Sequence, residues 1–130
     1  MKHLIFSILA LFGISSMFGC MNKERQFTDL EVAEFANLIS SGNVRIVDVR
    51  TPGEFSEGHI RDAVNIDVKS AGFFDDAKRE IKPGIPVAVY CRSGKRSVDA
   101  SEKLVKMGFK VYNLKGGILD WQKEGKTVVK

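Results

Sequence analysis

The residues with the clearest chemical potential are Cys91 and the basic residues that follow it. Arg92, Lys95 and Arg96 place three positive charges within the five residues after the thiol. Nearby cations favour the thiolate, which is the nucleophilic form of cysteine. The pattern therefore predicts a nucleophilic cysteine, and the alternative is a surface turn that contains a buried, inert thiol.

The segment around Cys91 is typical of a strand, a tight loop and a helix in succession. The run Val87-Ala88-Val89-Tyr90 predicts a buried strand, and Ser97 can begin a helix. Because ligands bind at the C-terminal ends of strands in open α/β sheets, the loop between them is a candidate site. Its backbone N–H groups and the start of the helix can form a cup for an anion. The candidate binding residues are Arg92, Ser93, Gly94, Lys95, Arg96 and Ser97.

Asp48 and Arg50 are candidate supporting residues for this loop. They lie at the end of the β-branched run from Val44 to Val49, which predicts a second buried strand. Asp48 could orient Arg96 or another donor of the Cys91 loop. The alternative is an ion pair or a turn hydrogen bond at the strand end.

Three further residues are expected to be structural. Thr51-Pro52-Gly53-Glu54 has the capping-box spacing, so Glu54 is expected to cap a short helix. His59 is expected to be packed and hydrogen-bonded rather than catalytic. Trp121 is expected to close the core, with its N–H bonded to a partner.

The rest of the chain alternates predicted helices and strands. Thr28-Asp29-Leu30-Glu31 also has the capping-box spacing, which predicts a helix that begins near Thr28. Strands are predicted again at residues 63–66 and 111–114. Strands that alternate with helices imply an α/β fold, a single domain with a central parallel sheet and helices on both faces. Another helix is expected to bury one face, formed by Phe73, Phe74, Ala77 and Ile81.

Composition excludes several classes of protein. The chain has 130 residues, of which 44% are hydrophobic and 28% charged, so it is neither a disordered nor a low-complexity chain. Its two cysteines exclude a disulfide framework and a four-cysteine metal site. The net charge of +4 is mild and gives no support to nucleic-acid binding.

The first 20 residues differ from the rest of the chain. A basic start at Lys2 precedes an apolar run and a group of small residues, and no acidic residue precedes Glu24. This pattern is typical of an export signal, and the run is too short for a membrane span of roughly 20 apolar residues. The alternatives are an uncleaved anchor and a disordered tail.

The segment Met17-Phe18-Gly19-Cys20 resembles a bacterial lipoprotein box, in which the cysteine carries lipid and becomes the new N-terminus. The resemblance implies a signal peptide at residues 1–19, lipidation of Cys20, a tether at residues 20–26 and a folded domain at residues 27–130. It also implies a location in the bacterial cell envelope, facing the periplasm and anchored to a membrane by lipid. Cys91 would then be the one remaining thiol, without a disulfide partner in its own chain.

Four groups of residues, taken in order and spacing, resemble the rhodanese (sulfurtransferase) domain family. The resemblance runs from about Thr28 to Trp121, and the layout is similar to that of the small exported single-domain members. It implies a single rhodanese-like domain. The matching residues are Asp48-Val49-Arg50 with Pro52 and Glu54-Phe55; Gly58-His59-Ile60 with Ala63 and Asn65-Ile66; Tyr90 to Ser97; and Leu114, Gly116-Gly117-Ile118 and Trp121.

The resemblance implies that Cys91 attacks the outer sulfur of a small anionic donor such as thiosulfate. A persulfide forms on Cys91 and passes its terminal sulfur to a thiol or cyanide acceptor, or to a sulfur-accepting protein. The family's reaction needs no metal and no organic cofactor. The positions of Asp48 and Arg50 support the active-site loop in this family.

Other functions remain open at this point. The chain could be a persulfide carrier without significant turnover, or an anion-binding or sensing module. Phosphatases of this architecture use Cys-x5-Arg, whereas here the arginine comes one residue earlier, at Arg96. The family associates this six-residue loop, from Cys91 to Arg96, with sulfur rather than with phosphate or arsenate.

Overall fold

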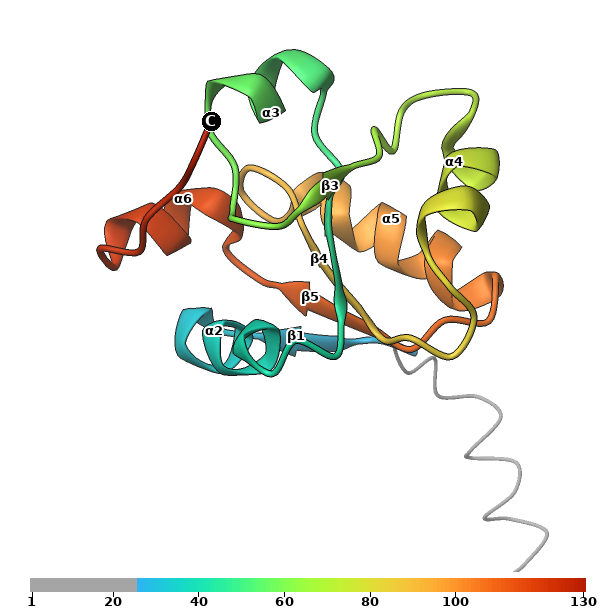
Figure 1. Cartoon of the computed structure of the whole chain (residues 1–130), viewed down its shortest axis with the longest axis horizontal. Helices are drawn as coiled ribbons and strands as arrows, with labels where there is room; N and C mark the ends of the chain where they lie inside the picture. Colours follow the sequence, from blue (N-terminus) through green and yellow to red (C-terminus); the bar gives the residue numbers. More distant parts are fainter. Residues whose placement is uncertain (1–25) are drawn as a thin grey trace, which may run out of the picture.

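The computed structural model of the protein describes residues 26–130 (Figure 1). The expected signal peptide, Cys20 and all of the expected tether except Gln26 lie outside these residues. Within residues 26–130, none of the helices is long and apolar enough to cross a membrane.

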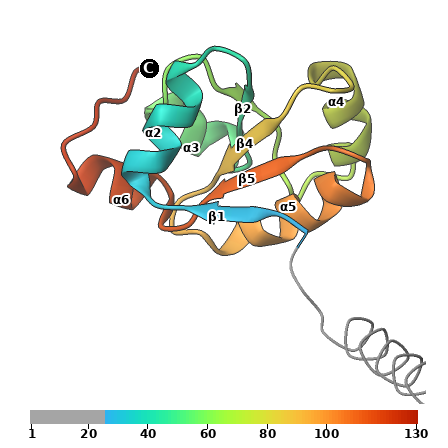
Figure 2. The same ribbon diagram turned by 90° about the horizontal axis from the view of Figure 1, so that it is seen from below.

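The centre of the fold is a sheet of five parallel strands in the order β1-β5-β4-β2-β3. The strand before Cys91 is therefore the middle one, and Figure 2 shows the short first strand at one edge. The predicted α/β class with a central parallel sheet is confirmed. The strands are β1 (Thr28–Leu30), β2 (Arg45–Asp48), β3 (Val64–Asn65), β4 (Val87–Tyr90) and β5 (Val111–Leu114).

Helices cover both faces of the sheet (Figure 1). Residues of α2 and α6 share one core cluster with Ala88 and Tyr90 of β4. Residues of α4 and α5 share the other cluster with Val87, Val89 and Cys91, because side chains alternate across a strand. The helices are α2 (Val32–Ser40), α3 (Pro52–Glu57), α4 (Phe73–Glu80), α5 (Lys95–Lys106) and α6 (Gly117–Lys123).

The expected helix start at Thr28 is wrong. Thr28 begins β1, which pairs with β5, and the Lys115 N–H donates to the Leu30 carbonyl at 3.0 Å. The helix begins at Val32, and its capping box is formed by Glu31 and Glu34 instead. Two overlapping capping patterns occur in this stretch, and pairing with a distant strand decides between them.

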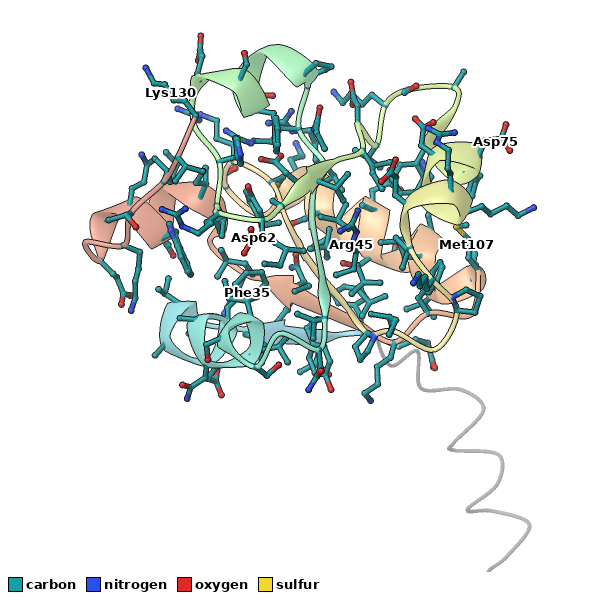
Figure 3. All side chains as sticks on the ribbon, viewed as in Figure 1. Phe35, Arg45, Asp62, Asp75, Met107 and Lys130 are labelled. Atoms are coloured by element: carbon teal, nitrogen blue, oxygen red, sulfur yellow. The ribbon has the colours of Figure 1, made fainter. Side chains whose placement is uncertain are left out.

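One residue of the expected buried face of α4 is exposed. Phe73, Ala77 and Ile81 are buried, whereas Phe74 keeps 47% of its surface exposed. Phe74 is one residue from Phe73, which turns it about 100° around the helix and out of the apolar stripe. In Figure 3, Asp75 likewise points away from this helix.

Other local expectations are confirmed. The Thr51 and Glu54 side chains form a capping box at the start of α3, with Pro52 in the first helical position. Trp121 is buried, and its Nε1–H donates to the Thr127 carbonyl at 2.9 Å. His59 stacks on the Phe55 ring, and its Nδ1 lies 3.0 Å from the Phe55 carbonyl oxygen. Figure 3 shows Phe35 between α2 and the strands, in the same core as Trp121.

Candidate active site

Cys91 lies directly after the central strand β4, with its sulfur inside the loop that follows. The Gly94 N–H donates to Sγ at 3.1 Å, and the Ser97 N–H donates to it at 3.3 Å. The thiol also lies 3.4 Å from the Ser97 hydroxyl oxygen, to which it donates. The Cys91 side chain is only 1% exposed. The thiol is therefore buried, yet its sulfur is in contact with polar donors rather than with aliphatic side chains alone.

The loop reaches this shape because of Gly94. Its φ of 105° lies in the left-handed region, and a Cβ there would come within 2.0 Å of the Lys115 carbonyl oxygen. The helix α5 begins at the next residue, Lys95, two residues before the expected start at Ser97. The first turn of α5 therefore includes Ser97 and directs its N–H group at the sulfur.

The start of α6 is hydrogen-bonded to the backbone of the Cys91 loop. The Ile118 N–H donates to the Cys91 carbonyl at 2.9 Å, and the Leu119 N–H donates to the Arg92 carbonyl at 3.1 Å. Gly117 has a φ of 67°, and a Cβ there would come within 2.3 Å of the Arg92 carbonyl oxygen. Because these carbonyls bond to α6, the loop presents N–H groups rather than carbonyl oxygens to the sulfur. The contact of Gly117 with the Cys91 loop was not expected from the sequence.

The Arg96 side chain turns toward α3 and pairs with Glu54. Its two terminal nitrogens donate to the two Glu54 oxygens at 2.7 and 3.0 Å. This hydrogen bond is the main reason that the pKa of Glu54 is lowered to about 2, with Thr51 contributing. The same hydrogen bond raises the pKa of Arg96 above its ordinary value. Glu54 therefore has two roles: it caps α3, as expected, and it holds the last basic residue of the loop.

Asp48 pairs with Arg50 and not with Arg96. The Arg50 guanidinium donates to both Asp48 oxygens, at 2.6 Å for the shortest contact, and to the Gly58 carbonyl at 2.7 Å. Burial acts to lower the pKa of Arg50, but the hydrogen bond and charge of Asp48 outweigh it and raise that pKa. Of the two alternatives for Asp48, the structure shows the strand-end ion pair.

Tyr90 connects this buried ion pair to the central strand. Its ring lies 5.9 Å from the Arg50 guanidinium carbon, and its hydroxyl oxygen accepts the Ile60 N–H at 3.0 Å. Burial, together with the nearby Asp48 carboxylate, raises the pKa of Tyr90 far above its ordinary value. The neutral phenol is held by its hydrogen bond from the Ile60 backbone.

Two open pockets flank the loop, and Arg92 lines both. The smaller one, of about 230 Å³, lies between α3 and α6 and includes Arg50 and Glu54. The larger one, of about 460 Å³, is lined by Val68, Lys69, Arg92, Ser93, Lys95, Arg96 and Asp99.

The structure thus brings together three of the predicted residues around the sulfur, Cys91, Gly94 and Ser97. It places Ser93 and the cations of Arg92 and Lys95 on the wall of the larger pocket. Sequence reasoning missed the contact of Glu54 with Arg96 and the presence of Lys69 in that wall. Both residues lie in loops or helices that follow C-terminal strand ends, and that position is the signal that could have indicated them.

A metal site was not expected from the sequence. Within residues 26–130, no group of three or more His, Cys, Asp or Glu side chains is arranged to hold a metal ion.

Comparisons with known proteins show which family the chain resembles. A model of the rhodanese-like domain family matches residues 31–124. A sulfurtransferase of Allochromatium vinosum is 37% identical over 93 residues, which are 71% of this chain and 84% of the relative. Thiosulfate sulfurtransferase 18 of Arabidopsis thaliana is 32% identical and covers 83% of this chain and 88% of its own length. The crystal structure of a rhodanese-related protein from Thermoplasma volcanium is 29% identical, with a TM-score of 0.71 over 79% of this chain and 98% of its own. The chain therefore belongs to the rhodanese-like domain family.

Proposed function

We propose that the protein is a sulfurtransferase that carries sulfur as a persulfide on Cys91. The observation that carries the proposal is the pair of N–H donors, from Gly94 and Ser97, on a single sulfur atom. Such donors stabilise negative charge on sulfur, which both the attacking thiolate and the persulfide bear. Relatives named as sulfurtransferases support this type of activity in general.

The reaction has two balanced steps. In the first, the Cys91 thiolate forms a bond to the outer sulfur of thiosulfate, the S–S bond of the donor breaks, and its electron pair leaves with sulfite. In the second, a nucleophile such as cyanide attacks the outer sulfur of the persulfide, thiocyanate leaves, and the Cys91 thiolate is restored. Negative charge is conserved in both steps, and neither step needs an oxidant or a reductant.

The burial of the thiol favours a donor whose transferable sulfur is a terminal atom. The Cys91 side chain is 1% exposed, so a bulky group cannot surround its sulfur without opening the loop. Thiosulfate meets this condition, because its outer sulfur is bonded to one atom.

Arg96 acts in this proposal as a positioning residue. Because its guanidinium is bonded to Glu54, it links the first turn of α5 to α3. That link holds the helix end whose Ser97 N–H contacts the sulfur. Contact with the donor is left to the cations of Arg92 and Lys95, which extend from the exposed part of the loop.

The test compares wild type with Cys91→Ser in an assay that follows thiocyanate formation from thiosulfate and cyanide. Lys110→Gln, at the opposite end of the sheet, is the matched control. We expect activity in wild type and Lys110→Gln and none in Cys91→Ser, with one added sulfur on Cys91 by intact mass after donor treatment. Equal rates in wild type and Cys91→Ser would refute the role of Cys91.

The same measurements separate the alternatives. A persulfide carrier gains the added sulfur but turns over slowly with cyanide. An anion-binding module shows neither the added sulfur nor turnover, and its anion binding survives Cys91→Ala.

We further propose that the protein is exported and anchored by lipid on Cys20 in a bacterial cell envelope, facing the periplasm. The support is the basic start, the apolar run and the cysteine that ends the signal-like segment. Cys20→Ala should release the protein from the membrane fraction. The intact mass of the wild-type mature protein should correspond to a lipidated chain that begins at Cys20. Membrane retention of Cys20→Ala would favour an uncleaved anchor instead.

A further inference from the structure

The charged side chains around the larger pocket divide into paired and unpaired groups. Arg96 is paired with Glu54, and Asp99 accepts from the Lys103 ammonium at 3.1 Å. Within residues 26–130, the remaining three cations of the pocket wall form no ion pair, and all three are exposed. These three cations are Lys69, Arg92 and Lys95.

Lys69 is contributed by the loop between β3 and α4, and the backbone of that loop is fastened to the fold. The Val68 side chain is buried, and its N–H donates to the Val49 carbonyl at 3.2 Å, just past the end of β2. The Lys69 N–H donates to the Asp67 carboxylate at 2.9 Å, which closes a tight turn. The Cα of Lys69 is therefore held at the rim, and only its flexible side chain is free to reach a ligand.

The number of unpaired cations equals the negative charge that the first step assembles. A thiolate carries one negative charge and thiosulfate carries two, so their approach is opposed by strong repulsion. Three unpaired cations at the rim offset these three charges. The pocket of about 460 Å³ that these cations line lies beside the Cys91 loop, and Cys91 itself is not one of its lining residues.

We propose that Lys69 completes, with Arg92 and Lys95, a three-cation rim that recognises a dianionic sulfur donor. This inference rests on the proposed function and deepens it, because it assigns donor selection to a residue outside the Cys91 loop. The rim favours thiosulfate over donors with one negative charge. Asp67 does not line the pocket, but its carboxylate accepts the Lys69 N–H and its charge also acts on Arg96.

The test measures the rate constant of persulfide formation on Cys91 in single-turnover experiments with two donors. Thiosulfate is the dianion, and an alkanethiosulfonate, which also has a terminal sulfur, is the monoanion. We expect Lys69→Gln to slow the reaction with thiosulfate about threefold to tenfold, the range that one exposed charge can supply. The loss should be smaller with the monoanion and should shrink at high salt.

Two control variants make the result specific. Lys69→Arg keeps the charge and should react faster with thiosulfate than Lys69→Gln does. Lys110→Gln removes an exposed lysine at the far end of the sheet and should also leave the rate unchanged. Equal rates for Lys69→Gln and Lys110→Gln with thiosulfate would contradict the proposed three-cation rim. The same conclusion would follow if Lys69→Gln slowed the reaction equally with both donors at every salt concentration.

A binding measurement separates failure of the rim from failure of the proposed function. Sulfate is an inert dianion, and its affinity for wild type and for Lys69→Gln can be measured by calorimetry. Weaker sulfate binding by Lys69→Gln without any persulfide in wild type would support the rim and refute sulfur transfer. Persulfide formation that is indifferent to Lys69 would support sulfur transfer and refute the rim.

Discussion

Two arginine–carboxylate pairs lie at the ends of neighbouring elements, and they differ in their exposure to solvent. In the Asp48–Arg50 pair the side chains are 0% and 7% exposed, and the shortest contact is 2.6 Å. In the Glu54–Arg96 pair they are 28% and 23% exposed, with a shortest contact of 2.7 Å. The two pairs therefore have nearly the same contact distance, although one is buried and the other is partly exposed to solvent.

The difference in exposure predicts a difference in the cost of breaking each pair. A buried pair is costly to break, since the remaining charge has neither a partner nor water. A partly exposed pair is cheaper to break, because water solvates the remaining group. We infer that the Asp48–Arg50 pair stabilises the end of β2, whereas the Glu54–Arg96 pair adjusts the position of the loop.

Breaking the buried pair should have the largest effect. Asp48→Asn keeps the shape of the side chain but leaves the Arg50 charge buried without a counterion, which costs about 3–5 kcal/mol. Urea unfolding at pH 7 measures the loss. The double variant Asp48→Asn/Arg50→Met should recover much of it, because both charges are then removed. If the double variant is no more stable than the single one, the unpaired charge is not the cause.

Breaking the partly exposed Glu54–Arg96 pair should cost about 1 kcal/mol at pH 7, and the cost should depend on pH. The pKa of Glu54 is lowered from 4.5 to about 2 in the folded protein. A depressed folded-state pKa contributes stability that is present above pH 4.5 and is lost as the pH falls toward 2. The stability difference between wild type and Glu54→Gln should therefore shrink over that interval in unfolding curves. Glu57→Gln, an exposed neighbour on α3, is the control, and an equal pH dependence there would contradict the assignment.

A double-mutant cycle sharpens the comparison. Arg96→Ala and Glu54→Gln should each slow persulfide formation, and the double variant should be no slower than either, with a coupling of about 0.5–1 kcal/mol. Because Arg96 is bonded to Glu54, its loss should lower the rate constant more than the affinity for thiosulfate. A change confined to the thiosulfate affinity would return Arg96 to direct donor binding.

The smallest effect on stability is expected at an ion pair that is mostly exposed to solvent. Lys115 and Glu31 approach to 4.0 Å, with side chains 66% and 68% exposed. Lys115→Ala should change the free energy of unfolding by less than about 0.5 kcal/mol. A larger change in urea unfolding would mean that exposure does not rank these pairs.

Features that depend on residues close together in the sequence could be predicted from the sequence. The β-branched run before Cys91 predicts the central strand, and the cations after it predict a polar loop around the sulfur. The family resemblance, carried by the same motifs, is confirmed by the comparisons. Errors occurred where two local patterns compete, at Thr28, or where one residue lies just outside a stripe, at Phe74.

The sequence alone determined where the Cys91 loop begins, its length and the charges it contains, because these follow from residues in succession. The tertiary structure alone decided which carboxylate holds Arg96. Asp48 is the last residue of β2 and Glu54 follows that strand, and Glu54, 42 residues from Arg96, is the one that reaches it. It also decided that Lys69 stands at the same rim as Arg92, since the order of strands in a sheet depends on packing between distant segments.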